Sequence, residues 1–301
     1  MSFTVALYYP WIDINDESWL KSAALYWETI RTIVPESIHE PYSTRTALEF
    51  QDAGVLVPLR VHSRMNEIEG LAEDILNYLS SPEAAEMLVA DRLPSCHRVH
   101  VDKLPETLHR LARINPDKLP YEVQRILERA QGALGYRRDG WYNVDERFAS
   151  FYMTLLATRL SERIGAGLLT DFPASNRLSV SAKLDAQQRD LFGQMRRRRE
   201  FDAYPPRRTI PSTLAQGMLV NLIMKKIGID PETPPGKILK FREDHAVELG
   251  RLREKIGSLT ESISSDSPIE HLQQRAHDVY QNSVLPALHS LERGLTASAI
   301  R

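Results

Sequence analysis

Phe3-Thr4-Val5-Ala6-Leu7-Tyr8-Tyr9 is a continuous apolar and aromatic run, and Pro10 ends it. A short run of this composition is typical of a buried strand. Asp16 then offers an N-cap, and Glu17 places a negative charge in the first helical turn, where it is stabilising. Apolar residues at helical spacing follow over residues 20–30, so a strand followed by a helix is expected here.

The alternation continues to about residue 80, with strands at residues 32–34 and 55–61 and helices at residues 44–53 and 65–79. Gly54 is expected to end the first of these helices. Pro58 has no N–H to donate, so its strand should lie at an edge of the sheet. Strands that alternate with helices favour a parallel sheet with right-handed crossovers. Residues 1–80 are therefore predicted to form an α/β unit.

Residues 81–203 are predicted to be a helical region. Prolines break residues 92–120 into short helices and turns, and residues 135–140 are expected to be an exposed connector. A longer helix should begin near Val144, end at about Ile164 and stop at Gly165. A strand at residues 167–172 is expected to return to the N-terminal sheet as its fourth strand.

Residues 204–301 are predicted to be a helical region that ends in an antiparallel hairpin. Apolar residues separated by three and four positions form an a/d seam, namely Leu249, Leu252, Ile256, Leu259 and Ile263. Ser267, Pro268 and Glu270 then start a second helix, and Pro286 should kink it. The seam must be covered within the hairpin, by the body of the protein or by a second copy. A homodimer is one expectation from this pattern.

The fold class expected from these patterns is α/β and predominantly helical, with a small parallel or mixed N-terminal sheet flanked by helices. Of the 301 residues, 42% are hydrophobic and 26% are charged, with a formal net charge of -2. These values indicate a globular core and no global attraction to nucleic acid or membrane. Cys96 has no partner for a disulfide, and neither a signal peptide nor a membrane-spanning run is evident. A cytoplasmic protein without membrane contact is expected.

Acidic side chains follow the predicted strands, where open α/β sheets bind ligands. Asp13 and Asp16 follow the first strand, Glu36 the second and Asp171 the fourth. Converging carboxylates could hold Mg²⁺ or Mn²⁺ and assist hydrolysis of a phosphodiester. The structural interpretation is that Asp16 only caps a helix and Asp13 a turn. A small-ligand pocket without metal is a third reading, and no other cofactor is expected.

A run of arginines is the second candidate site, and it consists of Arg196, Arg197, Arg198 and Arg199. Such a run could contact phosphates. On a helix, however, four consecutive residues point all round the axis, so a solvated role or pairing with acidic protein surface is the alternative. The chain has no Walker loop, no G-x-S-x-G and no zinc-ligand spacing.

Several stretches resemble an uncharacterised bacterial family, a domain of unknown function. They include Ala6-Leu7-Tyr8-Tyr9-Pro10, Trp19-Leu20-Lys21, Leu25-Tyr26-Trp27, Ile33-Val34-Pro35, Leu168-Leu169-Thr170-Asp171 and residues 238–243. The resemblance implies a bacterial accessory gene, with some members near phage-defence genes, and it transfers no functional residue. The family often has an aspartate after the tryptophan that corresponds to Trp27. Glu28 stands there in this chain, which keeps the charge and alters the reach.

These observations predict an interaction or regulatory protein without its own turnover, and the resemblance implies a place in phage defence. Its partner would be another protein, or a second copy bound through the C-terminal hairpin. The alternative is a metal-dependent phosphodiesterase or nuclease that uses Asp13, Asp16, Glu36 and Asp171.

Overall fold

The computed structural model describes residues 4–72, 96–105, 137–138, 141–170, 219–220, 223, 229–266, 272–285 and 296–297. The chain divides into two compact units. Unit 1 contains Met1–Ile33, Glu40–Pro58 and Ser161–Arg301, and unit 2 contains Val34–His39 and Leu59–Leu160. The division into segments 1–80, 81–203 and 204–301 stays a prediction.

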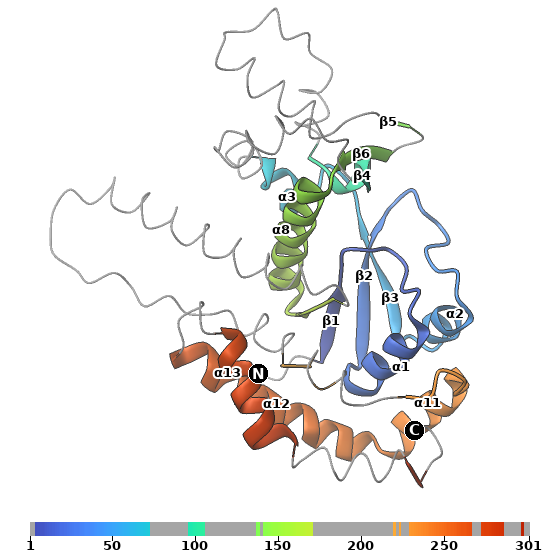
Figure 1. The fold of residues 1–301 in the computed structure, drawn as a ribbon. Coiled ribbons are helices and arrows are strands. Elements are labelled where there is room, and N and C mark those ends of the chain that lie inside the picture. The colour runs from blue at the N-terminus through green and yellow to red at the C-terminus, as the bar shows by residue number, and fades with distance from the viewer. Residues whose placement is uncertain are drawn as a thin grey trace, which may run out of the picture. The chain divides into compact units, whose positions relative to one another are not determined.

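A four-stranded parallel sheet is built from β1 (Val5–Tyr8), β2 (Thr29–Pro35), β3 (Leu56–Val61) and β7 (Gly167–Leu169). The strand order is β3-β2-β1-β7, and β1 pairs in parallel with both β2 and β7 (Figure 1). The expected α/β class with an N-terminal parallel sheet is therefore confirmed. Strand β3, which contains Pro58, lies at the edge of the sheet as its missing N–H required.

The order of the strands reverses direction once along the chain. The chain steps from β1 to β2 and β3 in one direction, and β7 then lies on the other side of β1. Right-handed crossovers place α1 (Glu17–Tyr26) and α2 (Arg45–Asp52) on the same face of the sheet, as Figure 1 shows. The topological switch point therefore lies between β1 and β7.

Helix α1 is the centre of unit 1. Asp16 caps it as expected and accepts a hydrogen bond from the Trp19 N–H at 2.9 Å. Every residue from Leu20 to Tyr26 is buried, including Lys21, whose ammonium donates to the Pro231 carbonyl at 2.6 Å. The helix ends at Tyr26, whereas the apolar spacing had predicted that it continues to Ile30. Ile30 belongs to β2 instead, because Trp27 adopts an extended backbone.

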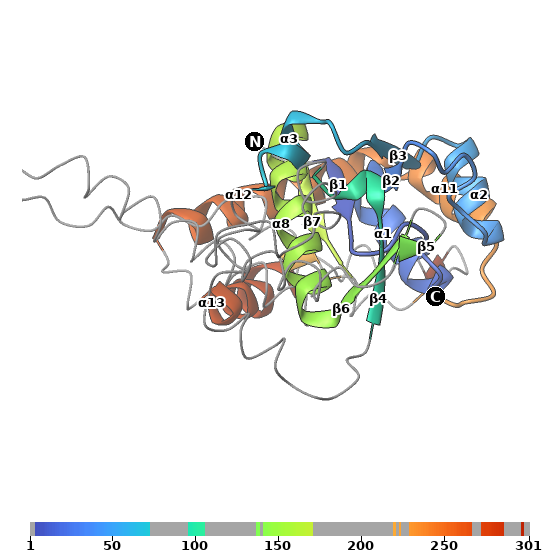
Figure 2. The ribbon, with the colours of Figure 1, turned by 90° about the horizontal axis from the view of Figure 1, so that it is seen from above.

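Two C-terminal helices pack against α1. They are α11 (Pro235–Asp244) and α12 (Ala246–Asp266), and both contact α1, while α11 also lies beside α2 (Figure 2). The part of the predicted seam from Leu249 to Leu259 is covered within the chain. Leu249 and Ile256 are buried, and Leu252 and Leu259 pack against the core cluster that contains Ile256.

After α12, the chain is described again at α13 (Leu272–Val279) and a π-helical turn at Tyr280–Val284. Helices α12 and α13 contact each other. The connection at residues 267–271, with its predicted N-cap, and Pro286 lie outside the described residues. None of the helices in the described ranges has both the length and the hydropathy that a membrane span needs.

Unit 2 contains a second sheet that the sequence patterns did not predict. Strands β4 (Cys96–His100), β6 (Trp141–Asp145) and β5 (Arg137–Arg138) pair antiparallel in the order β4-β6-β5. Turns or short helices were expected at residues 96–100 and a connector at residues 137–138, and both expectations were wrong. The helix expected from near Val144 is present and begins at Glu146, because Val144 belongs to β6. Strand pairing across about 40 residues competes with local turn signals, and propensity alone does not reveal it.

The remaining described elements of unit 2 are short apart from α8. They are α3 (Asn66–Glu69), the 3-10 turn η1 (Val101–Lys103) and α8 (Glu146–Ile164). Helix α8 ends at Ile164, and Gly165 follows with a φ of 62°, a left-handed conformation that favours glycine. This end was expected from the sequence.

Candidate functional site

The two predicted site acids after β1 hold the local backbone. The Asp13 carboxylate accepts hydrogen bonds from the Ile14 N–H at 2.8 Å, the Ser43 N–H at 2.9 Å and the Ser43 hydroxyl at 2.5 Å. Asp16 caps α1. Both carboxylates are therefore engaged in fixing the loops around α1, which matches the structural interpretation of these two residues.

The other predicted site residues do not join them in one described cluster. Glu36 is exposed in the turn after β2 and belongs to unit 2, whereas Asp13 and Asp16 belong to unit 1. Asp171 and the arginine run at residues 196–199 lie outside the described residues. Within the described ranges, no group of three or more His, Cys, Asp or Glu residues is arranged to hold a metal ion. Convergence of the four acids stays a prediction.

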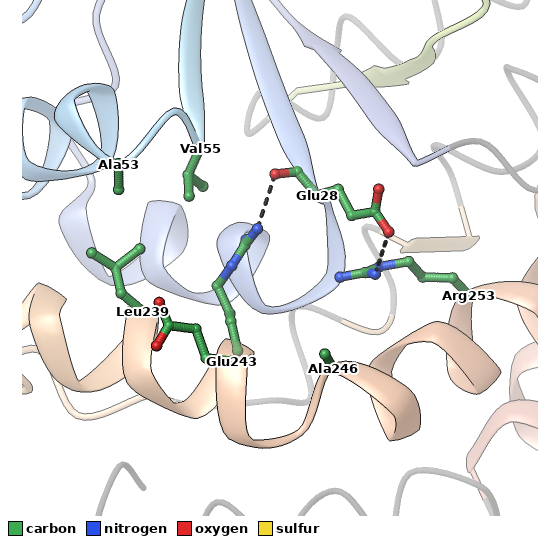
Figure 3. A pocket seen from close by; sticks show the side chains of 8 residues that line it. Glu28, Ala53, Val55, Leu239, Glu243, Ala246 and Arg253 are labelled. Carbon is green, nitrogen blue, oxygen red and sulfur yellow. Dashed lines mark hydrogen bonds and ion pairs between the residues drawn. The ribbon is translucent and has the colours of Figure 1, made fainter.

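A cleft of about 400 Å³ lies in unit 1 at the N-terminal ends of the parallel strands, away from the carboxyl ends where the predicted site acids follow the strands (Figure 3). Glu28 directly precedes β2 and Val55 directly precedes β3, so this is the edge at which the strands begin. We call it the arginine cleft, and its lining consists of Glu28, Ala53, Val55, Leu239, Arg242, Glu243, Ala246 and Arg253.

Arg242 of α11 terminates helix α1 from outside. Its guanidinium donates hydrogen bonds to the carbonyls of Ala24, Trp27 (2.7 Å) and Glu28 (2.9 Å). The last carbonyls of any helix lack partners within the helix, and they form the negative end of its dipole. Helix α1 has no basic residue in its own last turn. Arg242, more than 200 residues away in sequence, therefore supplies the positive charge that the last turn of α1 lacks.

Arg253 of α12 completes this arrangement. Its Nε donates to the Tyr26 carbonyl, and its Nη1 lies 2.8 Å from the Glu28 carboxylate. The side chain of Arg253 is 8% exposed, whereas that of Glu28 is 52% exposed. The ion pair therefore joins a buried guanidinium to a carboxylate that also reaches solvent (Figure 3).

The electrostatics of the cleft are dominated by the two arginines. Burial and, to a lesser extent, the charge of Arg253 lower the pKa of Arg242 to about 10, and Glu28 partly opposes both effects. Burial also lowers the pKa of Arg253, against the opposing influence of Glu28 and Tyr26. Both guanidiniums stay protonated at neutral pH. Two carboxylates also line the cleft, Glu28 and Glu243, and among the described contacts only Glu28 forms an ion pair, with Arg253. Arg242 is therefore the guanidinium that an added anion can pair with.

The sequence contains one signal for this site, namely an arginine on the apolar face of the helix that becomes α12. Arg253 is four residues after Leu249 and three before Ile256, so it lies on the buried face of α12. A charge in such a position must be paired. In addition, two stretches that carry the family resemblance, Leu25-Tyr26-Trp27 and residues 238–243, meet at this site through Arg242.

A second polar cluster lies in unit 2 and was missed altogether. The Ser37 hydroxyl donates to the Asp102 carboxylate at 2.7 Å and lies 3.4 Å from Nε2 of His100. Nδ1 of His100 accepts the Asp102 N–H at 3.2 Å, so the neutral ring carries its proton on Nε2. That nitrogen cannot accept the proton of Ser37. The hydrogen bonds of this cluster therefore fix the orientation of the imidazole. They do not provide the histidine acceptor for the serine proton that a Ser-His-Asp triad needs.

Comparison with known proteins finds no matching protein-family model, no matching curated protein and no matching solved structure. The family resemblance of the N-terminal stretches therefore stays a prediction.

Proposed function

We propose that this chain is a non-catalytic interaction protein that binds an acidic segment of a protein partner in the arginine cleft. One observation carries the proposal, namely that the partly buried Arg242 and the buried Arg253 meet at Glu28 in an open cavity, Arg242 at its backbone carbonyl and Arg253 at its carboxylate.

The hydrogen-bonding capacity of the two arginines supports an anionic ligand. A guanidinium has five N–H donors. Arg242 donates to three described acceptors and Arg253 to two. Each side chain thus keeps donors for a carboxylate, and binding in a partly desolvated cleft strengthens such charge-assisted hydrogen bonds.

The remaining lining supports a segment that is both acidic and apolar. Ala53, Val55, Leu239 and Ala246 form an apolar wall beside the charged residues. The volume of about 400 Å³ is near the lower end of the usual range for ligand pockets. It suits one or two side chains of a peptide better than a large cofactor.

The C-terminal helices contribute to this proposal. We infer that α12 and α13, which contact each other, form the antiparallel hairpin, and that the whole chain is predominantly helical. Because the seam on α12 packs within the chain, a different protein is favoured as the partner over a second copy. Light scattering at tens of micromolar should then give a monomeric mass. The role in phage defence stays a prediction that rests on the resemblance.

The test uses labelled peptides of about ten residues, enough for the one or two anchor side chains that a cleft of this size accepts. One peptide series alternates Glu or Asp with Leu or Val, and the matched series carries Gln or Lys at the acidic positions. Fluorescence anisotropy should detect binding of the acidic series only. The proposal is overturned when neither series binds, or when both bind equally.

Two neighbouring substitutions locate the binding. Ala246→Glu places a carboxylate into the cleft at the first residue of α12, where a negative charge suits the helix dipole. It should abolish binding of the acidic peptide. Val247 is 63% exposed and does not line the cleft, so Val247→Glu should leave binding unchanged. Equal losses in both variants would contradict the proposal. Metal-dependent nicking of DNA or RNA that Asp13→Ala abolishes would replace it with the phosphodiesterase alternative.

A further inference from the structure

One face of the antiparallel sheet in unit 2 combines a basic and an aromatic side chain. Arg98 and His100 alternate with Val99 along β4, and the register pairs His100 directly with Trp141 of β6. Residues two apart on a strand, and residues opposite each other on paired strands, share one face. Val99 is buried on the other face, whereas Arg98 is exposed. Arg98, His100 and Trp141 therefore define a surface that we call the Trp141 face.

Arg98 and His100 both contact the Trp141 ring. The Arg98 guanidinium lies over the Trp141 ring, 5.0 Å from its centroid. The His100 ring meets the same ring edge-on at 4.9 Å and 87°. Because Arg98 is exposed and Trp141 is only partly buried, the guanidinium can leave the ring without disturbing the core.

His100 provides a fixed wall for this face. Its Nδ1 accepts the Asp102 N–H at 3.2 Å, and its Nε2 lies 3.4 Å from the Ser37 hydroxyl, which itself donates to Asp102. The imidazole is thus held by contacts at both nitrogens and is 6% exposed. A tryptophan that rests against a fixed ring loses little freedom when a second planar group stacks on it, which favours binding.

The charge of this sheet is positive. Strand β5 consists of Arg137 and Arg138, and its register places Arg138 opposite Trp141. Together with Arg98, the described strand residues of the sheet carry three arginines, and their one carboxylate is Asp145 at the end of β6. An arginine over an aromatic ring, in a sheet whose described strands contain further arginines, matches a polyanion whose planar bases are available for stacking.

We propose that the Trp141 face binds single-stranded nucleic acid. One base stacks on Trp141 in the place of the Arg98 guanidinium, and Arg98 moves to a neighbouring phosphate. The exchange is favourable because stacking of a base on an aromatic ring is stronger than an exposed cation–π contact. A duplex does not qualify, since its base faces are covered by neighbouring bases. This site lies in unit 2, so it is independent of the arginine cleft.

Binding is measured by anisotropy of labelled single strands of DNA and RNA about 15 nucleotides long, at salt concentrations from about 50 to 200 mM, a range over which phosphate contacts weaken strongly. The expected result is binding of the single strands, with an affinity that falls as salt rises. Absence of binding at about 50 mM salt overturns the proposal. Equal affinity for a duplex of the same sequence overturns it too, and so does full competition by a free mononucleotide at the same concentration.

Matched variants assign the binding to the face. Trp141→Leu should weaken binding about tenfold or more, and Trp141→Phe, which keeps an aromatic ring, should retain most of it. Trp11 is exposed in unit 1, so Trp11→Leu is the control and should have no effect. Arg98→Gln should reduce the slope of log K against log salt by about one, whereas Arg251→Gln, at an exposed position of α12, should not.

The arginine run at residues 196–199 is the competing source of phosphate contacts. The control is a variant with four substitutions, Arg196→Gln, Arg197→Gln, Arg198→Gln and Arg199→Gln. In this background, Trp141→Leu should still weaken binding of the single strands. If this quadruple change abolishes binding and Trp141→Leu does not weaken it, the Trp141 face is not the site.

Discussion

Replacing Arg242 by methionine tests whether a distant side chain terminates helix α1. Methionine keeps most of the aliphatic stem and removes the guanidinium that donates to the carbonyls of Ala24, Trp27 and Glu28. The Glu28 carbonyl lies at an exposed position and can be hydrated after the change, whereas the Ala24 carbonyl belongs to a fully buried residue. The loss should therefore come mainly from the buried end of helix α1.

The magnitude follows from these contacts. A buried carbonyl left without a partner costs about 1–3 kcal/mol. Loss of a cation from a helix C-terminus adds about 0.3–1 kcal/mol. The lowered pKa of Arg242 indicates that burying its charge is itself unfavourable, which offsets part of this loss. We expect Arg242→Met to lower the free energy of unfolding by about 1–3 kcal/mol.

The assay is urea unfolding at neutral pH, followed by tryptophan fluorescence and far-UV circular dichroism. With an m-value of about 3 kcal/mol per molar urea, the midpoint should fall by about 0.3–1 M. Lys240 is exposed on the same helix, so Lys240→Met is the matched control and should stay within about 0.5 kcal/mol of the parent. Arg242→Lys should be intermediate, because an ammonium lacks the planar fork of donors. The reasoning is refuted when Arg242→Met and Lys240→Met destabilise equally.

Three further predictions concern packing, capping and pH. A Cβ at Gly167 would lie 2.6 Å from the Trp27 ring, so Gly167→Ala should destabilise by about 1–3 kcal/mol in urea unfolding. Gly250 has open space in α12, and Gly250→Ala should stabilise by up to about 1 kcal/mol, so a loss of stability there would contradict the packing argument. Asp16→Ala removes the N-cap of α1 and should cost about 1 kcal/mol, while Asp16→Asn should cost much less; equal losses would argue against the cap. Burial lowers the pKa of Lys103 from 10.5 to about 7. Between these two pH values the unfolded chain binds more protons than the folded chain. The free energy of unfolding should therefore rise as the pH increases from about 7 to 10.5. Lys103→Met should remove that rise and stabilise the protein at pH 7 and below, and an unchanged pH slope would contradict the shift.

Much of the N-terminal unit follows from local sequence. The apolar run at residues 3–9 becomes β1, Asp16 caps α1, and Gly54 ends α2 with a φ of 71°. Pro58 marks β3 as an edge strand. These features depend on backbone propensities and on hydrogen bonds between near neighbours in the chain, so a short window of sequence contains the information that decides them.

Only the tertiary structure decided the rest. The end of α1 depends on Arg242, and its cleft joins residues near position 28 to residues near position 250. The Trp141 face depends on pairing of β4 with β6, which are about 40 residues apart. In both cases the stabilising partner is remote in sequence. Local sequence does not reveal which of the many arginines binds the end of α1, or which short apolar run pairs with β4. Which of them does so is set by the packing of whole elements, because a buried carbonyl or an unpaired strand must find its partner wherever the fold places one.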